Sequence, residues 1–170
     1  METSQGEGHL TSGPLGRRRR GDLRDVLLSL PSSLWGRDRR RGETEMSREV
    51  IVTGRRASVP ISPAVKVGNT VYCSGQIGID PATGQIAGIG VKEQTEQTLK
   101  NLKAVLEAAG SSLEKVDKTT VFITNQKDYE AMNEVYSTFF PQDPPARSCV
   151  VVAALARPGL IVEIECIAHT

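Results

Sequence analysis

Apolar and polar residues recur with two different periods along residues 46–170. Three- and four-residue spacing of apolar side chains runs through residues 91–109 and 128–140, which predicts two amphipathic helices. Gly110 stands where a helix commonly ends, and Pro141 stops the second helix. The two helices are therefore well delimited by the sequence.

Short runs of β-branched residues predict six strands, at residues 50–52, 64–67, 70–74, 116–123, 148–153 and 161–168. Gly68 and Asn69 predict a hairpin between the second and third strands, and the turn at 157–159 predicts another between the last two. The order β-ββ-α-β-α-ββ indicates an α+β fold, a single mixed β-sheet with two helices packed on one face.

The run 149–155 is apolar on both sides of its predicted strand, which is typical of a sheet buried on both faces. Two helices can cover only one of these faces. The other would expose a large apolar patch in a monomer, so we expect a partner subunit to cover it.

Composition divides the chain near Met46, although the net charge of the whole is only +1. Residues 1–45 hold nine arginines, seven acids and no lysine, and we expect them to form a disordered Arg-rich N-terminal extension. Residues 46–170 have a net charge of −1 and form the expected folded domain. The arginine-rich, lysine-free extension is also typical of a mitochondrial transit peptide, but its acids count against import. Met46-Ser47 resembles a second initiation point, so we expect a cytoplasmic protein, with mitochondria as the alternative.

Apolar run lengths, net charge and the positions of histidine and cysteine disfavour several classes of protein. No segment approaches the roughly 18 consecutive apolar residues of a membrane span, and the near-zero net charge makes nucleic acid an improbable obligate partner. The two histidines, His9 and His169, lie near opposite ends, which argues against a histidine metal site or a Ser/His/Asp triad. Three cysteines in apolar runs, Cys73, Cys149 and Cys166, predict free thiols. We expect no metal and no cofactor.

Arg147 and Glu163 are the strongest candidates for chemistry. Arg147 follows a rigid proline-containing segment, so it is either a surface ion-pair residue or a guanidinium fixed to grip a carboxylate. Glu163 and Glu165 share the face of the last strand opposite its apolar side chains, where buried charge requires a partner or a function. Cys149 shares a face with Arg147.

Hairpin pairing of the last two strands would offset Arg147 and Glu163 by about five residues, on the order of 16 Å. A site that uses both residues would therefore combine neighbouring subunits more easily than it would form within one chain.

Weaker candidates come from small and amide side chains. Ser74 and Gly75 end a strand with residues that admit close approach of a ligand, or form an ordinary strand exit. Asn133 on an apolar helical face is either a core amide or a pocket contact. No phosphate-binding glycine motif and no stripe of aromatic and basic residues for single-stranded RNA occur in the domain.

Several ordered motifs over residues 48–170 resemble the RidA family, also called YjgF/YER057c/UK114. They are residues 72–78 (YCSGQIG), 80–84 (DPATG), 97–102 (QTLKNL), 108–110 (AAG), 118–122 (KTTVF), 145–150 (PARSCV) and 162–168 (VEIECIA).

This resemblance implies a chorismate-mutase-like fold assembled as a homotrimer, with three sites between subunits. It implies hydrolysis of 2-imino acids and their enamine tautomers, such as 2-iminobutanoate and 2-iminopropanoate, to 2-oxo acids and ammonia, which detoxifies by-products of pyridoxal-phosphate enzymes. By similarity, Arg147 grips the substrate carboxylate and Glu163 positions the attacking water. The expected pocket residues are Ser74, Gly75, Ile61, Asn133 and the backbone around Cys149.

One departure from the family is Ile61, which stands where many members carry a pocket tyrosine and can supply only packing. It favours one alternative, a non-catalytic module that binds small carboxylates or a protein. A second alternative, an RNA-cleaving translation inhibitor, is weakened by the slightly acidic domain and by the lack of a histidine pair.

Overall fold

The computed structural model describes residues 47–54 and 59–170, so the predicted N-terminal extension, residues 1–45, lies outside the described residues. The described part holds strands β1 (Arg48–Ile51), β2 (Ala64–Val67), β3 (Thr70–Ile77), β4 (Val116–Ile123), β5 (Ala146–Val151) and β6 (Val162–His169). Its two α-helices are α2 (Val91–Ala108) and α3 (Tyr129–Phe139), and short 3-10 turns, Leu113–Lys115 and Gln126–Asp128, precede β4 and α3. The predicted order of elements is confirmed.

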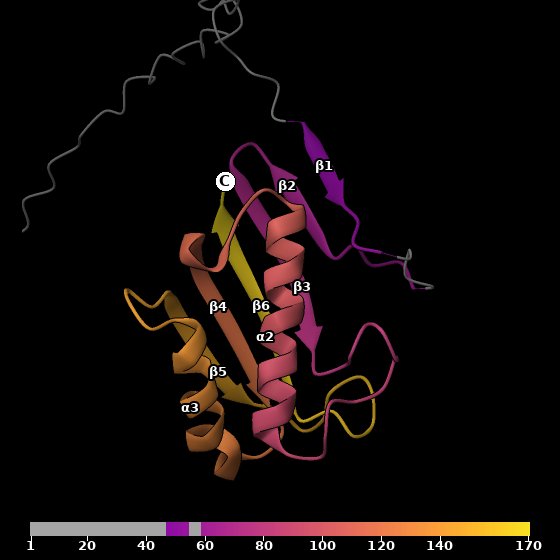
Figure 1. The fold of residues 1–170 in the computed structure, drawn as a ribbon, viewed down its shortest axis with the longest axis vertical. Helices are drawn as coiled ribbons and strands as arrows, with labels where there is room; N and C mark the ends of the chain where they lie inside the picture. Colours follow the sequence, from indigo (N-terminus) through magenta and orange to yellow (C-terminus); the bar gives the residue numbers. More distant parts are fainter. Residues whose placement is uncertain (1–46, 55–58) are drawn as a thin grey trace, which may run out of the picture. The chain divides into compact units, whose positions relative to one another are not determined.

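The strands form one sheet in the order β1-β2-β3-β6-β4-β5. All neighbours are antiparallel except β4 and β5, which run parallel. Both helices lie in front of the sheet in Figure 1, with α2 over its middle and α3 over the β4 and β5 side. The prediction of a mixed sheet with two helices on one face is therefore confirmed.

The predicted hairpin between the last two strands is wrong, because β4 lies between β5 and β6. The chain leaves β4, crosses the sheet through α3 and returns as β5 beside β4. A helical crossover of this kind brings the second strand back parallel to the first. The turn at 157–159 consequently belongs to a longer connection that passes the end of β4.

Strand β6 separates the two faces of the sheet by strict alternation. Val162, Ile164, Cys166 and Ala168 are buried beneath the helices. Glu163, Glu165 and Ile167 point to the opposite surface, here called the outer face, where the described residues provide no helix. This alternation was predicted from the sequence, and it decides on which side each candidate residue can act.

A buried amide ties the start of β6 to the start of α2. Gln94 is fully buried, and its Nε2 donates to the carbonyl oxygens of Gly88 at 3.3 Å and Gly159 at 3.0 Å. Its Oε1 accepts from the N–H of Ile161 at 3.0 Å. These bonds fix the loops at the end of the sheet from which Glu163 emerges.

None of the helices in the described part is long and apolar enough to cross a bilayer.

Candidate functional site

Arg147 lies on the helix side of the sheet, held against two aromatic rings. Parallel pairing places it opposite the buried Thr119 of β4, which directs both side chains toward α3. The guanidinium carbon is 4.6 Å from the centre of the Tyr136 ring and 6.0 Å from that of Tyr129. Both distances are within the range of a cation–π contact, which restrains a cation without neutralising it.

The Tyr136 ring is itself fixed in place. Its hydroxyl shares a hydrogen bond of 2.8 Å with Oγ1 of Thr119. Burial raises the pKa of Tyr136, and the Thr119 hydrogen bond and the charge of Arg147 oppose that shift, so the phenol stays protonated at neutral pH. Within residues 47–54 and 59–170, no carboxylate comes within ion-pair distance of Arg147. Its charge is therefore free to attract an anion.

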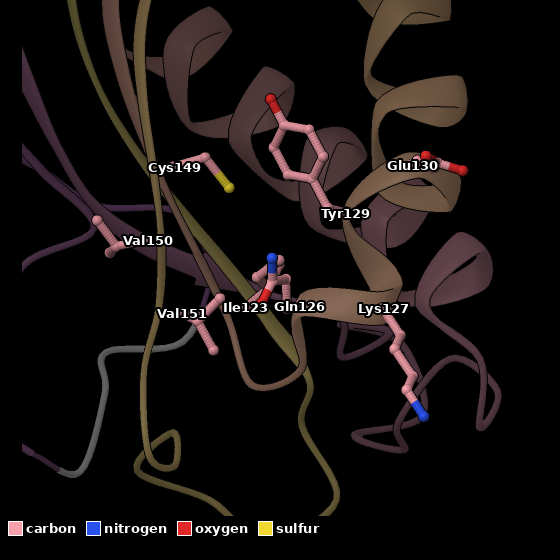
Figure 2. A pocket seen from close by; sticks show the side chains of 8 residues that line it. All are labelled: Ile123, Gln126, Lys127, Tyr129, Glu130, Cys149, Val150 and Val151. Carbon is pink, nitrogen blue, oxygen red and sulfur yellow. The ribbon is translucent and has the colours of Figure 1, made fainter.

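A pocket of about 590 Å³ opens beside this arginine, between β5 and the first turn of α3. Its wall is formed by Ile123, Gln126, Lys127, Tyr129, Glu130, Cys149, Val150 and Val151. Figure 2 shows the Cys149 sulfur and the Tyr129 ring facing each other across it. Burial raises the pKa of the Cys149 thiol, although the charge of Arg147 acts in the opposite direction. A neutral thiol is a poor nucleophile, so Cys149 contributes surface and backbone to the pocket.

Strand β5 also has backbone N–H groups that no other strand bonds, because it lies at the edge of the sheet. The N–H of Val152 donates to the Ile123 oxygen at 2.9 Å. In parallel pairing successive residues bond alternately to opposite sides, so the N–H of Val150 also turns toward β4 and that of Cys149 turns away. A ligand bound to Arg147 would therefore have the N–H of Cys149 nearby, which makes no bond to β4.

Glu163 belongs to a second group of candidates, on the outer face. A β-bulge interrupts the pairing of β3 with β6 between Cys73 and Gln76, and Gly75 lies in it. A Cβ atom added to Gly75 would lie only 1.9 Å from Oε1 of Glu163. Because Gly75 has no side chain, the Glu163 carboxylate can occupy the space beside its Cα atom.

The Glu163 carboxylate is held in a partly buried position. Burial is the main cause that raises its pKa above the ordinary value, and the neighbouring charge of Glu165 raises it further. A glutamate shifted in this direction exchanges protons with water closer to neutral pH than a free one does.

Ser74 and Ile61 belong to this second group. The Ser74 hydroxyl donates to the carbonyl oxygen of Ser62 at 2.7 Å, and its N–H donates to that of Pro63 at 3.0 Å. These bonds hold the segment before β2 against the bulge, with the Ile61 side chain 53 % exposed beside them. Ser74 thus holds the segment of Ile61 beside Glu163, and its hydroxyl proton is already used in the bond to Ser62.

The two groups lie on opposite faces of the sheet. Arg147 is level with Thr119 on β4 and, through it, with Cys166 on β6, three residues from Glu163. The predicted offset of about five residues is therefore wrong, because it assumed that β5 and β6 pair directly. Asn133, half-buried one helical turn after Tyr129, is on the Arg147 side but does not line the pocket.

Sequence analysis did not single out Tyr129 and Tyr136 as parts of the site; both lie within the apolar spacing that predicts the helix over residues 128–140. Their spacing of seven residues does place them on one helical face. The missing information was the parallel pairing of β5 with β4, which brings Arg147 beneath that face.

Metal ligands do not gather in this region. Across the described ranges, no group of three or more His, Cys, Asp or Glu side chains could hold an ion. All three cysteines are free, as predicted, although Cys73 and Cys166 face each other on β3 and β6.

Comparison with known proteins adds four findings. A sequence model of the family described as Endoribonuclease L-PSP matches residues 53–170. A RutC family protein of Pyrococcus abyssi is 46 % identical over 127 residues, covering 73 % of this chain and 98 % of that protein. The 2-iminobutanoate/2-iminopropanoate deaminase of Mus musculus is 46 % identical over 123 residues, covering 71 % of this chain and 90 % of that protein. The crystal structure of E. coli TdcF with bound serine superposes with a TM-score of 0.67 at 40 % identity, covering 72 % and 98 % of the two chains.

Proposed function

The chain belongs to the Endoribonuclease L-PSP family, the family of the RidA proteins, and from this premise we propose that it hydrolyses reactive 2-imino acids to 2-oxo acids and ammonia. The observation that carries the proposal is Arg147, a guanidinium held on two aromatic rings beside a pocket. The proposed substrates are 2-iminobutanoate and 2-iminopropanoate, released by pyridoxal-phosphate enzymes. Their removal would prevent damage by these reactive compounds.

The substrate carboxylate would bind the fork of Arg147 through two parallel hydrogen bonds. The unused N–H of Cys149 would take a further polar atom, and the short alkyl chain would contact the apolar side chains of the pocket. The relative solved with serine supports a small carboxylic acid as the ligand, since serine carries a carboxylate.

Glu163 would act on the water. The water oxygen forms a bond to the imine carbon, while the C=N electron pair moves to nitrogen, which takes up a proton. The C–N bond then breaks, ammonia leaves and the carbon becomes a carbonyl. Glu163 accepts a proton from the attacking water and passes it to the imine nitrogen. It then accepts the hydroxyl proton of the tetrahedral intermediate and passes it to the departing nitrogen, and its raised pKa favours both transfers. Since an imine is already electrophilic, orientation of water and substrate supplies much of the catalysis.

A site that uses both groups requires a second copy of the chain. We propose a homotrimer with three sites between subunits, in which β5 of one copy faces the outer face of the next. Tyr72, Val150 and Ile167 support this arrangement, because they are exposed on the outer face of a single chain. Covering them would remove apolar surface from water. A sedimentation experiment that finds only monomers would contradict the assembly.

The activity is tested by competition with a chemical trap. A pyridoxal-phosphate dehydratase acting on threonine generates 2-iminobutanoate in the presence of semicarbazide, and the protein should slow the appearance of the semicarbazone. Arg147→Ala should lose this effect, whereas Arg157→Ala, which removes an exposed arginine from a loop, should retain it. Equal and negligible suppression by the wild type and Arg147→Ala would end the proposal.

Two other candidates have specific support. Ile61 favours a module that binds small carboxylates without turnover, which would show as binding of 2-oxobutanoate with no suppression of the trap. The family description favours RNA cleavage. Cleavage by residues 46–170 that persists at high salt would support that reading, because non-specific phosphate binding by the arginine-rich extension weakens with salt.

The proposed location is the cytoplasm, and the free cysteines support a reducing compartment. Mitochondria remain the alternative because of the arginine-rich residues 1–45. Microscopy of the full-length chain with a C-terminal fluorescent tag distinguishes the two.

A further inference from the structure

Tyr129 connects the arginine to the pocket. It is the first residue of α3, and its hydroxyl oxygen lies 3.5 Å from Nη2 of Arg147. The same side chain lines the pocket opposite Cys149, as Figure 2 shows, and it is 42 % exposed. A ligand that reaches from Arg147 into the pocket must therefore pass the Tyr129 phenol.

The other tyrosines cannot offer a hydroxyl to such a ligand. The chain has three tyrosines in all. The hydroxyl of Tyr136 is bonded to the buried Thr119, and Tyr72 pairs with Ile167 on the outer face. Position 61, on the Glu163 side, is an isoleucine without a polar atom in its side chain. Tyr129 is thus the one phenol available on the Arg147 side.

The contact with Arg147 leaves the phenol proton free. A guanidinium can only donate, so the Tyr129 oxygen is the acceptor in this contact and its own O–H has no part in it. At 3.5 Å the contact is at the outer limit of a hydrogen bond, so it holds the hydroxyl only weakly. A carboxylate that binds the Arg147 fork places one oxygen beside Nη2, within reach of that O–H.

We infer that the Tyr129 hydroxyl is a direct hydrogen-bond donor to the substrate carboxylate, in addition to the two donors of Arg147. The inference rests on the proposed function for the identity of the ligand, an acid with a carbonyl or imine at its second carbon. Tyr129 then takes part in ground-state binding: it contacts the carboxylate, while the water attacks the neighbouring carbon. Its removal should weaken binding and leave the chemical step nearly unchanged.

The test uses Tyr129→Phe, which removes the hydroxyl and keeps the ring. We expect KM for 2-iminobutanoate, and the dissociation constant of 2-oxobutanoate measured by calorimetry, to rise roughly tenfold or more, as for loss of a hydrogen bond to a charged group. The kcat should stay within about twofold. Thr138→Val removes an exposed hydroxyl from the last turn of α3, nine residues from Tyr129, and should change neither constant.

A ring-fluorinated tyrosine at position 129 separates donation from positioning of Arg147. Its more acidic phenol is a stronger donor and a weaker acceptor, so below its pKa it should tighten 2-oxobutanoate binding if Tyr129 donates. It should weaken binding if Tyr129 only accepts from Arg147, and that result would overturn the inference.

The two proposals can fail separately. Unchanged binding and KM in Tyr129→Phe, with an active wild type, overturn the inference alone. A wild type that binds 2-oxobutanoate but does not suppress the trap overturns the catalytic proposal alone, and weaker binding by Tyr129→Phe would still support the inference. A wild type that binds no 2-oxobutanoate overturns both.

Discussion

Mixing two inactive variants tests whether Arg147 and Glu163 act across a subunit boundary. Arg147→Ala retains Glu163, and Glu163→Gln retains Arg147, so each chain carries one intact half of the proposed site. In any cyclic trimer that contains both kinds of chain, one boundary of the three joins an intact arginine to an intact glutamate. We expect such mixed assemblies to regain about one third of the wild-type activity.

The geometry of the sheet sets this expectation. Along the strands, Arg147 and Glu163 differ by three residues, about 10 Å, and across the strands by two spacings, again about 10 Å. Their side chains also leave the sheet on opposite faces. In a 2-imino acid the carboxylate carbon and the imine carbon are joined by one bond of about 1.5 Å, so a single chain cannot hold both ends of the reaction.

The assay uses co-expression of the two variants with different affinity tags and purification on both tags in succession. Suppression of semicarbazone formation is then measured per assembly. Arg147→Ala mixed with the double variant Arg147→Ala/Glu163→Gln is the control and should stay inactive, because no chain supplies the arginine. Mixed assemblies of the two single variants that remain as inactive as their parents would refute the reasoning.

Three further predictions concern single features of the site. Gly75→Ala should abolish activity while the fold persists, because its Cβ would displace the Glu163 carboxylate; normal activity with an unchanged circular dichroism spectrum would contradict this. With deprotonated Glu163 as the base, activity should fall on the acid side at a pH above the ordinary glutamate pKa, and Glu165→Gln should move that acid limb to lower pH by removing a repulsive charge. An acid limb of the pH–rate profile that stays in place in Glu165→Gln would exclude an effect of the Glu165 charge on Glu163. Tyr136→Phe should lower the free energy of unfolding in urea by roughly 1–3 kcal/mol, because it strands the buried Thr119 hydroxyl, and adding Thr119→Val should recover most of the loss.

Local patterns were sufficient for the elements of this fold. The helix over 91–109 and the strand over 116–123 agree with α2 and β4 because amphipathic spacing and turn residues act within a few positions. The pairing of the last strands was not available from such signals. It depends on α3 as a crossover, and the turn at 157–159 suggested a hairpin that β4 prevents.

The site was predicted in the same uneven way. Alternation along β6 correctly separated Glu163 from the buried side chains. It could not reveal that Arg147 lies on the helix side, because the face of an edge strand is set by its neighbour β4. The space at Gly75 was also beyond local reasoning, since its contact with Glu163 joins positions 88 residues apart.

The contact between Gly75 and Glu163 also has a consequence for how related sequences vary. The backbone φ of Gly75 lies outside the left-handed region, so the peptide chain itself would accept another residue there. The carboxylate would not, because it fills the volume that any side chain would need. In relatives that retain this bulge, the glycine equivalent to Gly75 and the glutamate equivalent to Glu163 should therefore be kept or lost together. A relative with a larger residue in place of Gly75 should lack the glutamate.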